Sequence, residues 1–160
     1  MKEIVIKYKA ITNFSLLSTV DKDLMKRASE VANSAYAPYS SFHVGAALIL
    51  ENDHVVVGNN QENSSFPCGI CAERVALFSA GTNYPNLLIK KIAITAVSKD
   101  FNLENPVGPC GLCRQVLIEC EDKQGLDIEI ILFNKKQVIK LNKAKDLLPF
   151  FFKEEKLKRT

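Results

Sequence analysis

The chain has 160 residues, of which 47% are hydrophobic and 24% charged, and its formal net charge is +3. This length fits one domain, and this composition is ordinary for a folded protein with a core, which excludes an intrinsically disordered chain. The most obvious contributor to the positive charge is the tail 153–160, which is typical of a solvated chain end rather than of a nucleic-acid footprint.

The N-terminal residues 1–9 contain no continuous apolar stretch and no small-residue cleavage site, so we expect no secretion signal. Nowhere does an apolar run approach the ~18 residues that are needed to span a bilayer. We therefore expect a cytoplasmic protein with no membrane partner. No internal repeat or linker divides the sequence, which favours a single domain over 1–160 with residues 1–19 as an N-terminal extension.

The first expected helix follows this extension. Residues 18–21 are its candidate capping residues, and apolar side chains then recur at helical spacing: Leu24, Ala28, Val31, Ala32 and Ala35. We expect the helix to stop at Ala37–Pro38, because the residue before a proline disfavours helical geometry. Residues 44–50 and 54–57, on either side of a turn at 51–53, predict two strands of a hairpin.

The second half of the chain alternates helices with strands. Small apolar residues at helical spacing predict a helix from Cys71 to Ala80 that is closed by Gly81. The other expected elements are a strand over 92–97, a helix over 113–119, strands over 128–133 and 137–141, and a short helix over 142–148. Helices that alternate with strands in this way predict an α/β sandwich.

Two Cys-x-x-Cys pairs are present, Cys68 with Cys71 and Cys110 with Cys113. All four thiols could form a closed structural zinc site, whereas Cys71, Cys110 and Cys113 alone would leave the fourth zinc position open. A redox protein is a third alternative, which predicts thiol–disulfide exchange and no metal. The odd total of five cysteines favours metal ligation in a reducing compartment over a secreted disulfide framework.

Both cysteine pairs lie where helices are expected to begin. The unpaired N–H groups and the positive dipole end of a helix lower the pKa of a thiol there, which favours the metal-binding thiolate. Cys110 and Cys113 are three residues apart, so both sulfurs can face the same way in a first helical turn. Glu73 can face the same site as Cys71 only if Cys71 lies at the very edge of its helix. Taken alone, Glu73 is interpreted as an exposed first-turn acid.

Residues 71–74 (Cys-Ala-Glu-Arg) and 109–117 (Pro-Cys-Gly-Leu-Cys-Arg-Gln-Val-Leu) resemble the two motif halves of the cytidine deaminases. The similarity covers roughly residues 24–152 and includes the segments 39–47, 60–63 and 147–149. A cysteine at position 71 is similar to the free-nucleoside branch of that family. The resemblance implies a three-layer α/β/α sandwich with a central mixed sheet of about five strands.

The resemblance also implies one zinc ion per chain, held by Cys71, Cys110 and Cys113. Zinc lowers the pKa of bound water to about 7. Glu73, which is not a metal ligand in this family, would move protons from the water to ring N3 and to the leaving amine. Arg74 would donate hydrogen bonds to the ligand sulfurs and so offset the charge of three thiolates.

For the substrate, the resemblance assigns Asn60 and Glu62 to the ribose hydroxyls and Phe42 to the base. The Ala72 N–H would meet base oxygen O2, and the Gly108 carbonyl, at a position where the family more often has Ser or Thr, would accept from the leaving amine. Taken singly, residues 60–63 could be only a polar strand exit and Phe42 only a core residue.

Two further aromatic residues concern the assembly. Phe66 and Phe152 match family residues that reach the active site of a neighbouring subunit, although the family often has Tyr, with one more hydroxyl, where Phe66 stands. The resemblance therefore implies a homotetramer whose active sites are shared between subunits.

The function that we expect is the hydrolytic deamination of free cytidine and deoxycytidine to uridine and deoxyuridine plus ammonia, for pyrimidine salvage. Other zinc deaminases act on nucleoside antibiotics such as blasticidin S, on nucleotides or on nucleic acid. The sequence shows no basic patch interleaved with aromatics to hold a polynucleotide. Asn60 and Glu62 also suit neutral ribose hydroxyls better than a phosphate.

The structural alternative, a closed Cys₄ zinc site, is disfavoured by spacing. The 38 residues between Cys71 and Cys110 exceed the usual gap of about 15–20 residues in zinc ribbons. At the position of Cys68 the family usually carries an apolar residue, so the resemblance implies a small buried or loop thiol there that takes no part in the metal site.

Overall fold

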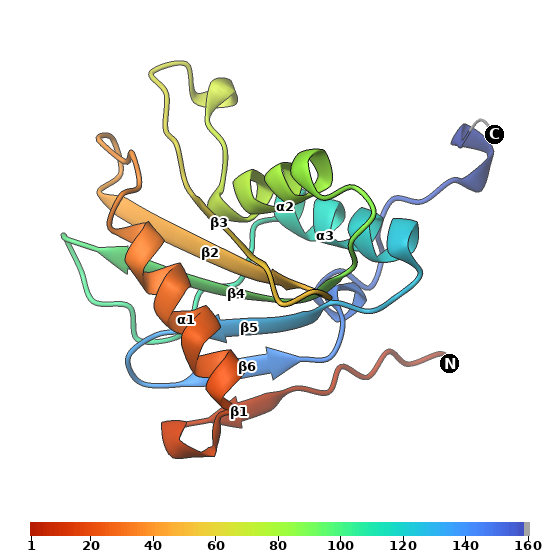
Figure 1. Cartoon of the computed structure of the whole chain (residues 1–160), viewed down its shortest axis with the longest axis horizontal. Coiled ribbons are helices and arrows are strands. Elements are labelled where there is room, and N and C mark those ends of the chain that lie inside the picture. The colour runs from red at the N-terminus through yellow and green to blue at the C-terminus, as the bar shows by residue number, and fades with distance from the viewer. Residues whose placement is uncertain (159–160) are drawn as a thin grey trace.

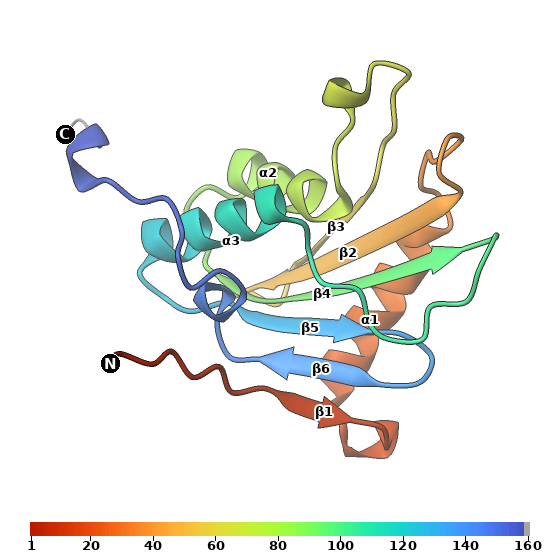
Figure 2. The same cartoon turned by 180° about the vertical axis from the view of Figure 1, so that it is seen from behind.

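The computed structural model describes residues 1–158, which form a six-stranded sheet with helices on both faces (Figures 1 and 2). The strands follow the order β1-β6-β5-β4-β2-β3. Only the pairing of β4 with β5 is parallel, so the sheet is mixed. The strands are β1 (Lys9–Ile11), β2 (Phe42–Leu50), β3 (Val55–Asn59), β4 (Ile89–Ser98), β5 (Glu129–Phe133) and β6 (Val138–Leu141).

Three helices cover the sheet. Helix α1 (Thr19–Ala32) lies on one face, and helices α2 (Ala72–Asn83) and α3 (Gly111–Gln124) lie side by side on the other (Figures 1 and 2). Four short 3-10 turns complete the described part of the chain: η1 (Phe14–Leu16), η2 (Phe66–Cys68), η3 (Ala144–Leu147) and η4 (Glu155–Leu157). The predicted three-layer α/β/α sandwich is therefore confirmed. Within residues 1–158, no helix is long and apolar enough to cross a membrane.

Each face of the sheet has its own hydrophobic core, as the alternation of strand side chains requires. Leu24, Met25 and Ala28 of α1 pack against Ala47 and other residues of one face. The larger core lies on the opposite face, between the sheet and helices α2 and α3: it includes Leu48, Leu50, Ala76, Leu77, Ile92, Ile94, Leu117, Ile118 and Ile130. The two cores place α1 and the pair α2–α3 in separate environments.

Two glycines in neighbouring strands allow the helices to approach the sheet closely. A Cβ atom added at Gly45 of β2 would lie 2.0 Å from the Ala28 carbonyl oxygen of α1. At Gly58 of β3 it would lie 2.5 Å from the Ala72 carbonyl oxygen and 2.6 Å from the Ala76 nitrogen of α2. Both contacts involve backbone atoms, which cannot move aside as a flexible side chain can, so each glycine determines how deeply its helix lies.

The sheet has six strands rather than the expected five or so, because the N-terminal extension contains β1. Its three residues pair antiparallel with β6, with Lys9 opposite Lys140 and Ile11 opposite Val138. Such a short, mostly exposed strand has too few residues to show an alternating pattern, and only its partner across the sheet defines it.

Several predicted helix ends were wrong. Helix α1 begins as expected, with Ser18 accepting a hydrogen bond from the Asp21 N–H, but it ends at Ala32 rather than at Ala37–Pro38. The chain leaves the helix early because Tyr36 pairs with the backbone on both sides of Gln61. The expected helix over 142–148 is only the 3-10 turn η3.

The glycine that was expected to close α2 lies inside that helix. Gly81 is helical, and α2 continues to Asn83, where the Tyr84 N–H bonds the Ala80 carbonyl. Instead, a glycine ends helix α3. Gly125 adopts the left-handed conformation with φ of 70°, and its N–H donates to the Glu121 carbonyl. Gly125 thus fills the C-terminal role that had been given to Gly81.

Candidate metal centre and the adjoining cavity

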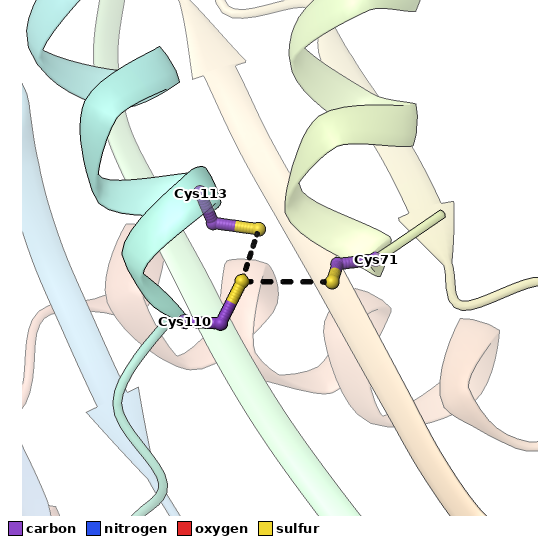
Figure 3. A group of neighbouring side chains, drawn as sticks. All are labelled: Cys71, Cys110 and Cys113. Carbon is purple, nitrogen blue, oxygen red and sulfur yellow. Dashed lines mark hydrogen bonds between the residues drawn. The ribbon is translucent and has the colours of Figure 1, made fainter. Parts of the chain in front are cut away.

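Three thiols meet where α2 and α3 begin (Figure 3). Cys71 and Cys110 are the N-cap residues of the two helices, and Cys113 lies in the first turn of α3. The Cys71 and Cys110 sulfurs are 3.8 Å apart, and the Cys110 and Cys113 sulfurs are 3.5 Å apart. All three sulfurs lie within 4.8 Å of one another, so the structure brings together the three predicted metal ligands.

Cys68 does not belong to this group. It lies exposed in the 3-10 turn η2, and within residues 1–158 the three-thiol cluster is the only set of metal-binding side chains that converges in this way. The geometry thus gives no support to a closed Cys₄ site. Cys120, the fifth cysteine, is half-buried in α3 beside the larger core, and burial raises the pKa of its thiol.

The short distances between the three sulfurs determine the charge state of the cluster. Interaction with the Cys113 thiol, and then with Arg74 and Cys110, lowers the pKa of Cys71 to about 5, although burial opposes the change. The same interaction with Cys71, together with burial, raises the pKa of Cys113. Near neutral pH the cluster therefore holds the Cys71 thiolate beside the Cys113 thiol, which keeps its proton. A metal cation can replace that proton.

The donor set fits zinc. Three sulfur ligands from two rigid helix starts match the thiolate donors that zinc prefers, and a three-residue set leaves the fourth tetrahedral position free. The Arg74 guanidinium lies beside the cluster, with its Nη2 atom 3.9 Å from the Cys71 sulfur. Its positive charge would balance part of the negative charge of three thiolates.

Glu73 faces the same place although it is only two residues from Cys71. This is possible because Cys71 has extended backbone geometry, with φ of −77° and ψ of 153°, and α2 begins one residue later. The Glu73 side chain lines the cavity but is only 4% exposed. Burial raises the pKa of the Glu73 carboxyl, and the nearby negative charge of Cys71 raises it further. Such a carboxyl accepts a proton more readily than an exposed one, which suits a group that exchanges protons.

A cavity of about 690 Å³ opens beside the thiols. Five of the predicted substrate-binding residues line it, together with Cys71, Glu73 and Cys110: Phe42, Asn60, Glu62, Phe66 and Gly108. Two predicted residues do not. Ala72 is fully buried at the start of α2, and Phe152 lies outside the lining, with its side chain 69% exposed.

The two polar residues assigned to the ribose already have partners in the chain. The Asn60 amide accepts from the Val44 N–H at 2.7 Å and donates to the Phe42 carbonyl at 2.9 Å. The Glu62 carboxylate accepts from the Ser40 hydroxyl and from the Tyr39 N–H. The Ser40 bond is the largest cause that holds the pKa of Glu62 below its ordinary value. Asn60 therefore holds the start of β2 close to the end of β3, and Glu62 holds the residues just before β2.

The structure adds residues that sequence reasoning missed. Phe101 stacks on Phe42, with the ring centroids 6.3 Å apart, and Tyr39 meets the edge of Phe66. Arg114 donates to the Pro109 carbonyl at 2.7 Å and to the Leu147 carbonyl at 3.0 Å. Arg114 lies inside the second cysteine motif and Tyr39 at the start of the segment 39–47, so these two had a sequence signal, whereas Phe101 had none. The aromatic pairings depend on contacts between distant segments.

A Cys₃ group beside a buried glutamate that is not a ligand is the metal-site pattern of the zinc deaminases, and this is the class that fold and site define. The model of the cytidine and deoxycytidylate deaminase zinc-binding region matches residues 18–125. The chain belongs to the cytidine deaminase family, as its motifs predicted.

Individual relatives agree with this assignment. The chain is 39% identical over 133 residues to a cytidine deaminase of Halalkalibacterium halodurans, covering 82% of this chain and 93% of the relative. It is 37% identical to a cytidine deaminase of Sporosarcina psychrophila, covering 84% and 92% of the two chains. The crystal structure of cytidine deaminase from Burkholderia pseudomallei matches with a TM-score of 0.70 and 38% identity, over 82% of this chain and 98% of that one.

Proposed function

We propose that this protein catalyses the zinc-dependent hydrolytic deamination of free cytidine and deoxycytidine to uridine and deoxyuridine, with release of ammonia, in pyrimidine salvage. The observation that carries the proposal is the convergence of three thiols and the buried Glu73 on one end of a cavity. The relatives named cytidine deaminase support the choice of substrate.

Cys71, Cys110 and Cys113 would hold one zinc ion per chain, since their sulfurs already converge. When bound there, zinc would supply hydroxide at neutral pH for attack on C4 of the cytosine ring. Arg74, whose Nη2 atom lies 3.9 Å from the Cys71 sulfur, would keep the thiolates from carrying an unbalanced negative charge.

Glu73 is the proton carrier of the proposed reaction. It takes one proton from the attacking water and delivers it to ring N3; after attack it takes the remaining proton from the new C4 hydroxyl and delivers it to the amine, which leaves as ammonia, so it acts as a base and as an acid in turn. A raised pKa suits this double role, because the carboxyl must be protonated for part of each cycle. The burial of Glu73 is the main cause of that raised pKa.

The cavity has a suitable size and lining for a nucleoside. Its volume of about 690 Å³ falls within the range of small-molecule sites, about 300–1,000 Å³. Phe42 would contact the base, while the Ala72 N–H would bind base oxygen O2 and the Gly108 carbonyl would accept from the leaving amine. Asn60 and Glu62 would bind the ribose hydroxyls, because an amide and a carboxylate can each make further hydrogen bonds beyond those in the chain.

The proposed assembly is a homotetramer in which Phe66 and Phe152 contribute to a neighbouring active site, and in which Phe66 also lines the cavity of its own chain. Both side chains are exposed apolar aromatics, 76% for Phe66 and 69% for Phe152, as expected for residues that another subunit covers. We place the protein in the cytoplasm, where a reducing environment keeps its cysteines available as metal ligands. We propose no nucleic-acid or membrane partner.

Another small nucleoside, such as a blasticidin S-like antibiotic, is the alternative substrate. The test is ammonia release from cytidine, deoxycytidine, cytidylate and blasticidin S, measured alongside zinc per chain. We expect release from the first two compounds and about one zinc per chain. Release from blasticidin S alone would favour the alternative, and no release from any nucleoside would exclude the proposed function.

A further inference from the structure

The C-terminal segment carries three consecutive phenylalanines past helix α3 (Figure 2). Phe151 packs against the larger core, whereas Phe150 is 87% exposed and Phe152 is 69% exposed. A fully solvated aromatic ring leaves a large apolar surface in water, and Phe and Tyr rings of this kind are typical of binding interfaces. The segment is thus attached to its own subunit by one ring and presents the other two.

The backbone of Phe152 is held by one side chain of α3. The Gln115 amide donates from Nε2 to the Phe152 carbonyl at 2.8 Å, and its Oε1 atom accepts from the Phe152 N–H at 3.0 Å. Both backbone groups of one residue are therefore bonded to both ends of one amide. This arrangement determines where the Phe152 Cα lies while the ring remains exposed.

The neighbouring contacts of the segment are weaker restraints on Phe152. Lys153 pairs with Asp122 at 3.0 Å and with Glu155 at 2.8 Å, and the Lys153 side chain is well exposed. The pair with Glu155 is exposed on both sides and contributes little to stability. The Asp122 side chain is only 7% exposed, but its pair with Lys153 holds the residue after Phe152 and not Phe152 itself. Within the described residues, Gln115 is the only side chain that hydrogen-bonds Phe152 itself.

We propose that Gln115 is a positioning residue for deamination, which acts through Phe152 on the active site of a neighbouring subunit. The inference rests on the proposed function and on the proposed role of Phe152. Gln115 lies two residues after Cys113 in α3. The same helix therefore carries candidate metal ligands of its own site and the side chain that holds Phe152, an aromatic residue of the proposed neighbouring site. Because Phe152 lies on a C-terminal segment, its position depends on its two hydrogen bonds with Gln115, which we call the Gln115 clamp.

Helix α3 also offers a matched control. Gln124 makes the same two-sided bond to another residue, donating to the Ile89 carbonyl at 3.0 Å and accepting from the Ile89 N–H at 3.0 Å, and it also donates to the Leu126 carbonyl at 2.9 Å. Ile89 begins β4 and does not line the cavity. Loss of the Gln124 clamp should therefore lower stability without affecting substrate binding, which separates a general effect of losing such a clamp from a positioning effect.

The experiment compares Gln115→Leu, Gln124→Leu, Phe152→Ala and the double variant Gln115→Leu/Phe152→Ala, using ammonia release from cytidine. We expect kcat/KM to fall about ten-fold in Gln115→Leu, mostly through KM, because two hydrogen bonds of ordinary strength are lost. Zinc per chain should stay at the wild-type level. The double variant should be no worse than Phe152→Ala, because Gln115 acts only through that residue.

Three results would overturn the inference: an unchanged kcat/KM in Gln115→Leu, the same loss in Gln124→Leu, or a double variant whose losses multiply. Loss of zinc in parallel with activity would also overturn it, since Gln115 would then act on the metal centre of its own chain. A wild-type protein that releases no ammonia overturns the proposed function and this inference with it.

Mixed assemblies test whether the effect crosses between subunits. Gln115→Leu chains, which keep Glu73, are refolded together with Glu73→Gln chains, which keep the clamp. We expect activity per intact Glu73 to rise several-fold above that of Gln115→Leu alone, because the inactive chains supply a well-placed Phe152. Activity that stays at the Gln115→Leu level would show that Phe152 does not act across the interface.

Discussion

The two faces of the sheet each bury a polar cluster, and the two clusters differ in charge balance. On the α1 face, the Asp21 carboxylate lies 2.8 Å from both the Lys91 and the Lys140 ammonium groups. Glu129 contacts the same two lysines. Two positive charges thus offset two negative ones, and the cluster joins α1 to strands β4, β5 and β6.

On the α2–α3 face the balance is absent. When ionised, three thiols and the Glu73 carboxyl face a single guanidinium, that of Arg74. Buried charges that lack a counterion are costly, so such a group either keeps its protons or takes up a cation. The comparison shows how a structural cluster differs from a functional one: the first is complete within the chain, whereas the second needs a ligand.

The largest expected effect is the loss of the metal from the α2–α3 face. Cys113→Ser should remove zinc and abolish turnover, because a serine hydroxyl is a poor zinc ligand in place of a buried thiolate. Cys68→Ser is the matched control, since its thiol lies outside the cluster. Zinc per chain, measured by atomic spectroscopy, should remain at the wild-type level in Cys68→Ser, and a zinc-free Cys68→Ser protein would contradict the assignment of ligands.

The next effect concerns the proton carrier alone. Glu73→Gln keeps the shape and burial of the side chain but cannot exchange a proton, so kcat should fall by about 10²–10⁴. Zinc content and melting temperature should change little, because the proposed ligands are the three clustered thiols and not Glu73. Near-normal turnover in Glu73→Gln would exclude this residue as the proton carrier.

Substitutions of Gly45 and Gly58 test whether disturbing each face of the sheet affects the candidate metal site. Gly45→Ala and Gly58→Ala should each destabilise the protein by about 3 kcal/mol, because the new methyl group meets helix backbone. Only Gly58→Ala presses on the first turns of α2, where Glu73 and Arg74 lie. Zinc affinity, measured by competition with a chelator, should fall in Gly58→Ala and stay unchanged in Gly45→Ala. Equal zinc affinities in the two variants would contradict the claim that only the packing of the α2–α3 face supports the metal site.

The smallest effect belongs to the balanced cluster. Burial opposes ionisation of Asp21, but the hydrogen bonds and charges of Lys140 and Lys91 outweigh it and hold the Asp21 pKa below its ordinary value. The stabilisation is thus present above the unfolded-state pKa of about 3.9 and is lost as the pH falls through the lower folded-state pKa. Asp21→Asn should cost about 2 kcal/mol at pH 7.

The same substitution should cost progressively less as the pH falls below about 3.9, because the wild-type carboxyl becomes protonated as well. Denaturant unfolding at neutral and acidic pH measures both values. Asp23→Asn is the control on the same helix: its exposed pair with Arg27 should contribute at most about 0.5 kcal/mol. A pH-independent cost for Asp21→Asn would show that the lost ion pairs are not its cause.

The sequence predicted the elements that are defined by local signals. The start of α1, the hairpin of β2 and β3 and the helices after each cysteine pair follow from caps, periodicity and turns within a few residues. Sequence reasoning missed β1, whose pairing depends on β6 more than a hundred residues away. It also interpreted Asp21 only as a candidate cap, although its lysine partners are 70 and 119 residues away.

By itself, the sequence determined the family, the fold class and the short motifs that carry the candidate thiols and Glu73. Only the tertiary structure decided how they meet. Cys71 is an extended N-cap residue, so its sulfur and Glu73 can share one site, while Cys68 lies in a separate exposed turn. Convergence of this kind depends on how closely α2 and α3 approach the sheet, and that distance is set by packing at positions such as Gly58, outside both motifs.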